Sequence, residues 1–168
     1  MSDRNNTALL PVLSAGEIAE IDAQIAHVPQ RSAVAIDALK IVQAHRGWVS
    51  DASLRAIASH LQMSADELDG IATFYNLIFR RPVGEQVILL CNSISCWIKG
   101  CDQLQRQIGE QLGVGLGETT PDNRYTLLPV TCLGACDRAP VLMVGEELHE
   151  DVDAAALHKL FARSGGGA

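Results

Sequence analysis

Hydrophobic residues in the first half of the chain recur at the three- and four-residue intervals of an amphipathic α-helix. Four such segments follow one another, and their apolar positions are Ile18, Ile21 and Ile25; Ile36, Leu39 and Val42; Leu54, Ile57 and Leu61; and Leu68, Ile71, Tyr75, Ile78 and Phe79. A serine suited to the N-cap position precedes each segment, and a glutamate completes a capping box in the first and the last: Ser14, Ser32, Ser50 and Ser64, with Glu17 and Glu67. Pro29 and Gly47 stop the first two helices. The pattern predicts a small bundle of four short helices over residues 14–81.

The pattern changes after RRPVG at 80–84, which marks a candidate domain boundary. Short apolar runs at 87–91, 124–132 and 140–145 predict strands, and residues 147–152 form a plausible hairpin partner for the last of them. A helix is expected from about Trp97 to Leu112, and Asp153 can cap a final helix. The order β-α-β-β-β-α predicts a small α/β domain over residues 82–163, and an α+β chain overall. Residues 1–13 and 164–168 are expected to be flexible.

Composition and charge narrow the classes of partner. The hydrophobic fraction of 48% supports a packed core, and the formal net charge of −7 disfavours binding to nucleic acid or to anionic lipid. No apolar run approaches the roughly 20 residues of a membrane span. The N-terminus has neither a signal-peptide nor a transit-peptide pattern, so a reducing compartment is expected. In such a compartment, clustered cysteines are more often metal ligands or redox thiols than disulfides.

All five cysteines lie in two short stretches of the second half, CNSISCWIKGC at 91–101 and TCLGAC at 131–136. Cys91 and Cys132 end predicted strands, with Cys96 and Cys136 following at C-x4-C and C-x3-C spacing. Two loops at one edge of a sheet could therefore bring these four thiolates together. Cys101 instead falls on one apolar helical face, with Trp97, Leu104, Ile108 and Leu112. We therefore expect Cys101 to pack in the core.

The spacing favours a pair of sulfide-bridged irons, with roughly two thiolates per iron. A zinc site and a thiol redox pair remain open, although zinc prefers tighter C-x2-C turns. Candidates for easing the negative charge of an iron–sulfur centre are the loop amides of 92–95 and 133–135, together with Lys99 and Arg138.

The sequence shows no complete active site. The glycine-rich stretch GVGLGE at 113–118 follows a helix rather than a strand, and therefore predicts a helix stop and not a nucleotide site. No Ser/His/Asp or Cys/His set points to hydrolysis. TFYNLIF at 73–79 carries more apolar surface than one helix face can easily bury, which makes part of it a candidate interface.

The chain resembles the small thioredoxin-like [2Fe–2S] subunits of bacterial respiratory complex I, NADH:quinone oxidoreductase. The matching stretches are DALKIVQAHRGWV, GIATFYNLIFRRPVG, CNSISC, YTLLPVTCLGACDRAP and GEELHEDV. The resemblance implies a helical bundle followed by a thioredoxin-like domain. It places the four cluster ligands on Cys91, Cys96, Cys132 and Cys136, and none on Cys101.

This resemblance also implies a one-electron transfer subunit of an oxidoreductase. FMN and NADH would lie on a partner flavoprotein subunit, and larger subunits of the hydrophilic arm would be further partners. Neither nucleic acid nor direct membrane contact is expected. The complex would place the chain on the cytoplasmic side of the bacterial inner membrane. Alternatives are the equivalent subunit of a NAD-dependent formate dehydrogenase or NAD-reducing hydrogenase and, more remotely, a zinc-stapled interaction module.

Overall fold

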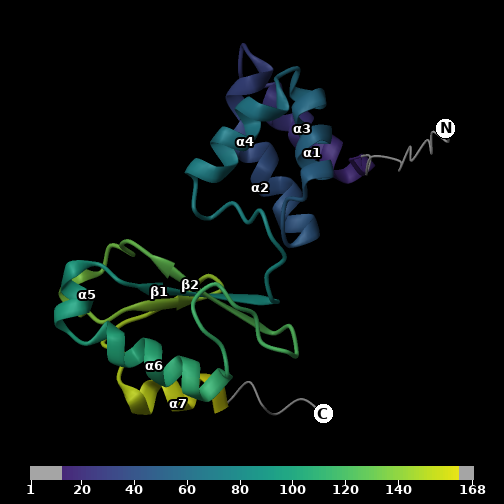
Figure 1. The fold of residues 1–168 in the computed structure, drawn as a ribbon. Helices are drawn as coiled ribbons and strands as arrows, with labels where there is room; N and C mark the ends of the chain where they lie inside the picture. The colour runs from purple at the N-terminus through teal and green to yellow at the C-terminus, as the bar shows by residue number, and fades with distance from the viewer. Residues whose placement is uncertain (1–12, 163–168) are drawn as a thin grey trace, which may run out of the picture. The chain divides into compact units, whose positions relative to one another are not determined.

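The computed structural model describes residues 13–162, and the chain divides into two compact units between Pro82 and Val83 (Figure 1). The ends predicted to be flexible, 1–13 and 164–168, lie outside the described residues except for Leu13. That residue is buried in the core of the first unit. No helix among residues 13–162 combines the length and the apolar character that a membrane crossing requires.

The first unit is helical. Its elements are α1 (Ala15–Ile25), the 3-10 turn η1 (Arg31–Val34), α2 (Ala35–Arg46), α3 (Asp51–Leu61) and α4 (Ala65–Phe74). Most of the apolar positions read from the sequence meet in one core, which includes Ile21, Leu39, Val42, Ile57, Leu61 and Leu68, each 0–1% exposed. Tyr75 does not, and it is 43% exposed. The predicted four helices are confirmed. Burying each of these aliphatic side chains contributes roughly 1.5–3 kcal/mol relative to leaving it in water.

Three of the four serine N-caps predicted for this unit are confirmed. Ser14 and Ser64 form complete capping boxes, and the Ser50 side chain accepts from the amide of Ser53. The prediction for Ser32 is wrong, because this residue lies inside η1 and α2 begins only at Ala35. The 3-10 turn leads directly into the helix, and the carbonyl of Ser32 accepts from the amide of Ala35. The 3-10 turn thus supplies a backbone acceptor for the amide of Ala35, at the start of a helix that has no capping side chain.

The fourth helix ends earlier than its apolar pattern predicts. It stops at Phe74 instead of running on to Phe79. The Gln43 side chain, from α2, donates to the carbonyl of Leu77 at 2.9 Å and accepts from the amide of Phe79 at 2.6 Å. These bonds hold the backbone of 77–79 outside a helix while Ile78 stays buried.

A buried ion pair lies within the first unit. Glu17 is 1% exposed, and its carboxylate accepts from Arg46 Nε and Nη2, both at 2.6 Å. Arg46 also donates to the Ser53 hydroxyl at 3.1 Å. The sequence showed Glu17 only as a capping residue, and its partner lies 29 positions away.

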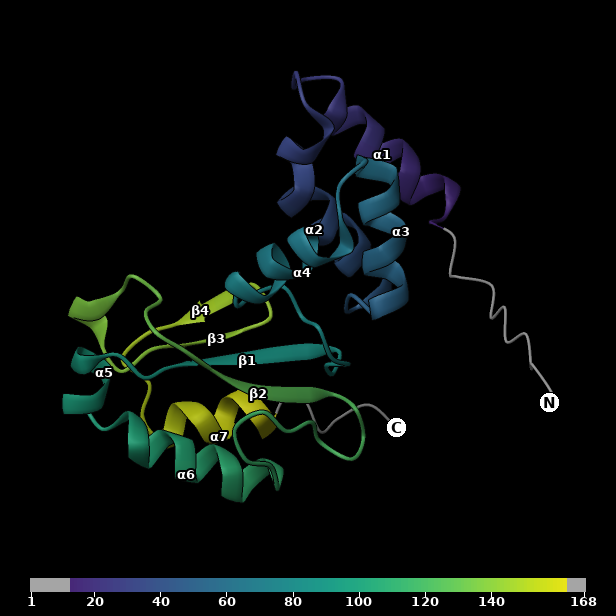
Figure 2. The ribbon, with the colours of Figure 1, turned by 45° about the horizontal axis from the view of Figure 1, so that its top comes forward.

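The second unit contains a four-stranded sheet in the order β2-β1-β3-β4. Its strands are β1 (Gln86–Cys91), β2 (Tyr125–Val130), β3 (Leu142–Val144) and β4 (Glu147–His149). β1 pairs parallel with β2 and antiparallel with β3, and β3 forms a hairpin with β4. Helices α6 (Cys101–Leu112) and α7 (Ala154–Ala162) cover one face of this sheet (Figure 2). Alternate strand residues pack against them in a core that includes Ile88, Leu90, Leu127, Leu142, Leu104, Ile108, Leu157 and Phe161.

The helix predicted from Trp97 to Leu112 is two helices, α5 (Ile94–Ile98) and α6. Gly100 separates them with a φ of +96°, which glycine adopts without steric cost. The break changes the direction of the chain, so the prediction that Trp97 shares one helical face with Cys101 is wrong, and its side chain is 57% exposed. The predicted burial of Cys101 is confirmed at 3% exposure. The cap of the last helix is also confirmed, because the Asp153 carboxylate accepts from the amide of Ala156 at 2.7 Å.

Candidate metal centre

Two adjacent parallel strands bring the cysteine loops to one edge of the sheet. Cys91 is the last residue of β1 and lies opposite Val130, the last residue of β2. Cys132 follows two residues after β2, and Cys136 begins the short 3-10 helix η2 (Cys136–Arg138). Cys96 lies in α5, which contacts η2. The topology therefore gathers the four predicted site residues, since parallel strands end at the same edge.

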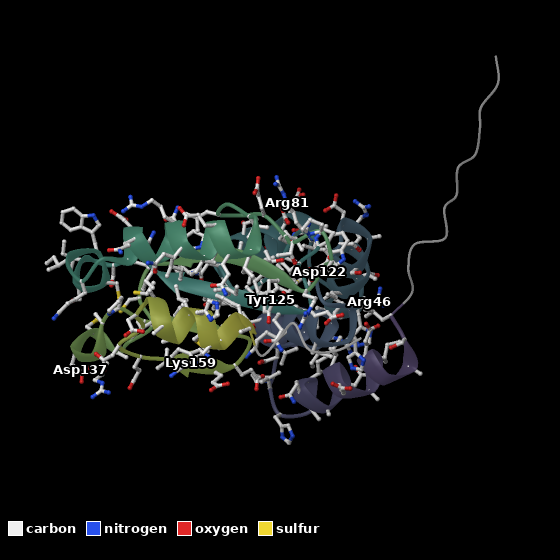
Figure 3. The ribbon with its side chains drawn as sticks, turned by 90° about the horizontal axis from the view of Figure 1, so that it is seen from below. Arg46, Arg81, Asp122, Tyr125, Asp137 and Lys159 are labelled. Carbon is white, nitrogen blue, oxygen red and sulfur yellow. The ribbon has the colours of Figure 1, made fainter. Side chains whose placement is uncertain are left out.

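The two pairs differ in burial. Cys91 and Cys96 are 1% and 0% exposed, in a cluster with Leu89, Val130 and Val141. Cys132 and Cys136 are exposed. Figure 3 labels Asp137, the neighbour of Cys136, at one end of the second unit. Tyr125, at the start of β2, lies well away from that end. One pair thus lines the interior and the other opens to the surface.

Sulfur contacts follow the same pairing. Cys132 Sγ and Cys136 Sγ are 3.6 Å apart, near the ~3.8 Å expected for two sulfurs at about 2.3 Å from one tetrahedral metal ion. The thiols of Cys91 and Cys96 are also in hydrogen-bonding contact. Among residues 13–162, no group of three or more His, Cys, Asp or Glu side chains lies close enough together to bind a single metal ion. The geometry is one of two neighbouring pairs.

Hydrogen-bond donors surround the sulfurs. The amide of Gly134 donates to Cys132 Sγ at 3.3 Å, and the Ser93 hydroxyl lies 3.2 Å from Cys91 Sγ. The amides of Ser93 and Leu133 also bond Cys91. These three amides come from the two loops that the sequence indicated. The amide of Val141, which bonds Cys96, comes from just before β3 and was missed, because no spacing rule points to that segment.

These contacts set the protonation of the thiols. Burial alone would raise the pKa of Cys91, but hydrogen bonds from the Ser93 hydroxyl and amide, from Cys96 and from the Leu133 amide lower it below its usual value. Burial raises the pKa of Cys96 to about 11, and its bond to Cys91 acts in the same direction. The pKa of Cys136 is raised, first by its hydrogen bond with Cys132 and then by the charge of that neighbour. Cys91 is therefore the thiol of the buried pair that ionises first.

The predicted cations lie beside acidic groups. Arg138 pairs with Asp151 at 2.8 Å and with Glu150 at 3.6 Å. Lys99 lines a hollow that Asp151 and Asp153 also line. A role for either cation in offsetting the charge of the cysteine site stays a prediction.

The donor set fits an iron–sulfur group. Four cysteine sulfurs are the ligands that such a cluster takes, and backbone amides aimed at those sulfurs are its usual support. Cys101 packs in the same buried cluster as Cys91 and Cys96, but it belongs to α6 and its Sγ lies 3.9 Å from the carboxylate of Asp102. Burial raises the pKa of its thiol. The glycine-rich stretch 113–118 is a helix stop as predicted, with Gly113 in the left-handed conformation at the end of α6.

Comparison with known proteins agrees with this geometry. The sequence profile of the thioredoxin-like [2Fe-2S] ferredoxins matches residues 21–164, and the chain belongs to that family. The predicted α+β, thioredoxin-like fold and its [2Fe–2S] cofactor are thereby confirmed.

Relatives within the family are named as one subunit of a specific oxidoreductase. The E subunit of the NADH-quinone oxidoreductase of Pseudomonas aeruginosa is 47% identical over 149 residues, covering 89% of this chain and 90% of the relative. The E subunit of the same oxidoreductase in Escherichia coli K12 is 43% identical over 151 residues, covering 90% of this chain and 91% of the relative. The predicted resemblance to this component of an oxidoreductase complex is confirmed.

Solved structures share the fold at lower identity. A NAD+-reducing [NiFe]-hydrogenase in the H2-reduced state superposes with a TM-score of 0.69 at 19% identity, and its air-oxidised state gives 0.67 at 20%. This chain spans 22% of the length of the hydrogenase chain in both cases.

Proposed function

We propose that this chain is a one-electron transfer subunit of an NADH:quinone oxidoreductase, and that Cys91, Cys96, Cys132 and Cys136 hold its [2Fe–2S] cluster. The observation that carries the proposal is the pair of cysteine loops at the ends of two adjacent parallel strands. The names of the relatives, which match along nearly their full length, support the assembly to which it belongs.

Each cysteine pair would clasp one iron. Cys91 and Cys96 would hold the buried iron, and Cys132 and Cys136 the iron nearer the surface. When bound, such a cluster accepts and returns single electrons. The amides of Ser93, Leu133 and Gly134 would partly offset the negative charge of the thiolates. The apolar surroundings of the first pair would exclude water, and the exposed second pair would be the side that a donor or acceptor approaches.

The partner that delivers electrons would be a flavoprotein subunit that binds FMN and NADH, within a larger hydrophilic arm on the cytoplasmic side of the membrane. This chain would supply no nucleotide site of its own. The helical first unit would dock on that partner. Its support is the exposed apolar segment at the end of α4 and just after it, where Phe74, Tyr75 and Leu77 are 80%, 43% and 49% exposed.

A second assembly shares the module. The likeness to the NAD+-reducing hydrogenase supports the fold. The alternative assembly is therefore a NAD-linked hydrogenase or formate dehydrogenase that contains a related subunit. Identities of 43–47% to the E subunits favour the quinone-linked complex. The larger subunits that copurify with the chain in its native host distinguish these assemblies: a NiFe or formate-oxidising subunit would overturn the proposed one.

Single cysteine-to-serine variants test the ligand set. We expect Cys91→Ser, Cys96→Ser, Cys132→Ser and Cys136→Ser to lose the visible absorbance of the cluster or to change it severely. Cys101→Ser is the matched control for the buried pair, because Cys101 is buried like Cys91 and Cys96 but belongs to α6, and its spectrum should stay close to that of the wild type. An essential Cys101 with a dispensable member of the other four would contradict the assignment.

A further inference from the structure

Ser93 occupies an N-cap position without acting as a cap. Its backbone, with φ −70° and ψ 168°, matches that of Ser14, Ser50 and Ser64 at the starts of α1, α3 and α4. Each of those three hydroxyls accepts from the amide three residues on. Within the described chain, the Ser93 side chain makes no such capping bond at the start of α5.

The hydroxyl of Ser93 is turned toward sulfur instead. Ser93 Oγ lies 3.2 Å from Cys91 Sγ, at the end of β1. Either group could donate while Cys91 is a thiol. As a metal ligand the cysteine carries no proton, so the hydroxyl alone can donate and the sulfur must accept. A bond from a neutral donor to a charged acceptor is stronger than one between neutral groups.

We propose that Ser93 is a positioning residue of the metal centre, whose hydroxyl donates to Cys91 Sγ and makes the centre easier to reduce. This inference rests on the proposed function. Adding one electron increases the negative charge shared by the sulfurs, so a donor aimed at one of them stabilises the reduced form more than the oxidised form. No proton is transferred, because the hydroxyl hydrogen stays on the serine oxygen throughout.

Side-chain shape and hydroxyl can be separated at this position. Ser93→Ala removes the hydroxyl, and the absence of a capping bond means that α5 should not be destabilised by the loss of an N-cap. Ser93→Thr keeps the hydroxyl, and Ser93→Val has the shape of threonine without it. Ser50→Ala, at a capping serine of the first unit, is the control for a serine unrelated to the cysteines.

The measurement is the reduction potential of the full chain, purified without air, reduced stepwise with dithionite and followed by visible absorbance, with iron and acid-labile sulfide determined for each variant. We expect Ser93→Ala and Ser93→Val to lower the ratio of reduced to oxidised centre about tenfold at a fixed potential, which is a shift of about 59 mV for one electron. Ser93→Thr and Ser50→Ala should keep the wild-type potential. If Ser93→Thr retains iron and sulfide while Ser93→Ala and Ser93→Val lose them, the hydroxyl is needed to hold the centre. That result would also support a positioning role for Ser93.

Two results would overturn the inference while leaving the proposed function intact. One is a full complement of iron and sulfide in Ser93→Ala with an unchanged potential. The other is an equal shift in Ser93→Thr and Ser93→Val. Wild-type protein without iron and sulfide would instead overturn the proposed function, and this inference with it.

Discussion

Glu17 has a second role that its sequence position does not indicate. The serine three positions before it predicts a capping box, which forms. The ion pair with Arg46 could not be predicted from local sequence patterns, because only the packing of α2 beside α1 brings the guanidinium to the buried carboxylate. Hydrogen bonds from Arg46 first, and also from Ser14, lower the pKa of Glu17 from 4.5 to about 2.

This pair predicts an acid-sensitive fold. Because the pKa of Glu17 is depressed on folding, its contribution to stability is fully present above the unfolded value of 4.5 and is lost as the pH falls toward about 2. The contribution is on the order of 3 kcal/mol. Chemical denaturation at pH 7 and at pH 2.5 measures it, with the double variant Glu17→Gln, Arg46→Met as control. The wild type should lose more stability between these pH values than the control, and equal losses would contradict the role of the pair.

The bounds of a helix could be predicted where the residues that determine them are close in sequence. Periodicity and caps identified α1, α3 and α4 because the residues that start each of these helices are close in sequence. The early end of α4 depends on Gln43, which lies far from it in sequence, and could not be foreseen. The break between α5 and α6 had a local signal, Lys99-Gly100, which the apolar period across it obscured.

Two glycines should respond oppositely to alanine. Gly100 has a φ of +96°, so Gly100→Ala should destabilise the protein by roughly 1–2 kcal/mol, although nothing described lies within 4 Å of an added Cβ. Gly70 is inside helix α4 with similar free space, so Gly70→Ala should stabilise it by about 0.5–1 kcal/mol. Free energies of unfolding of both variants check the contrast. A neutral or stabilising Gly100→Ala would contradict the conformational role of that residue.

Across the whole molecule, the sequence indicated more of the cysteine arrangement than of its surroundings. The two cysteine spacings and the strands before them were local signals, and they were sufficient to predict two loops that could meet at one edge of a sheet. The parallel pairing of β1 with β2, which brings the loops together, joins distant segments. The burial of one pair and the exposure of the other depend on how α5 and the loop before β3 pack. Those contacts, including the amide of Val141, join distant segments and carry no motif.

The exposed apolar segment should govern partner binding. Phe74 and Tyr75 contact each other edge to face at 5.3 Å between ring centres, at the end of α4. The double variant Phe74→Ala, Tyr75→Ala should weaken binding to a co-produced NADH-oxidising flavoprotein subunit by about 2 kcal/mol, that is, about 30-fold. The stability of the isolated chain should change by about 0.5 kcal/mol or less per exposed site.

Leu116, which is 40% exposed in the second unit, provides the control. Leu116→Ala should leave binding unchanged. If the double variant loses stability as much as it loses affinity, Phe74 and Tyr75 belong to the core of the folded unit and not to a docking surface.

The most direct test is the metal content of the chain purified in the absence of air. Two cysteine pairs that clasp a two-iron group require two irons and two acid-labile sulfides per chain, with a coloured protein that takes up one electron. A colourless protein that contains one zinc ion and neither iron nor sulfide would contradict the account.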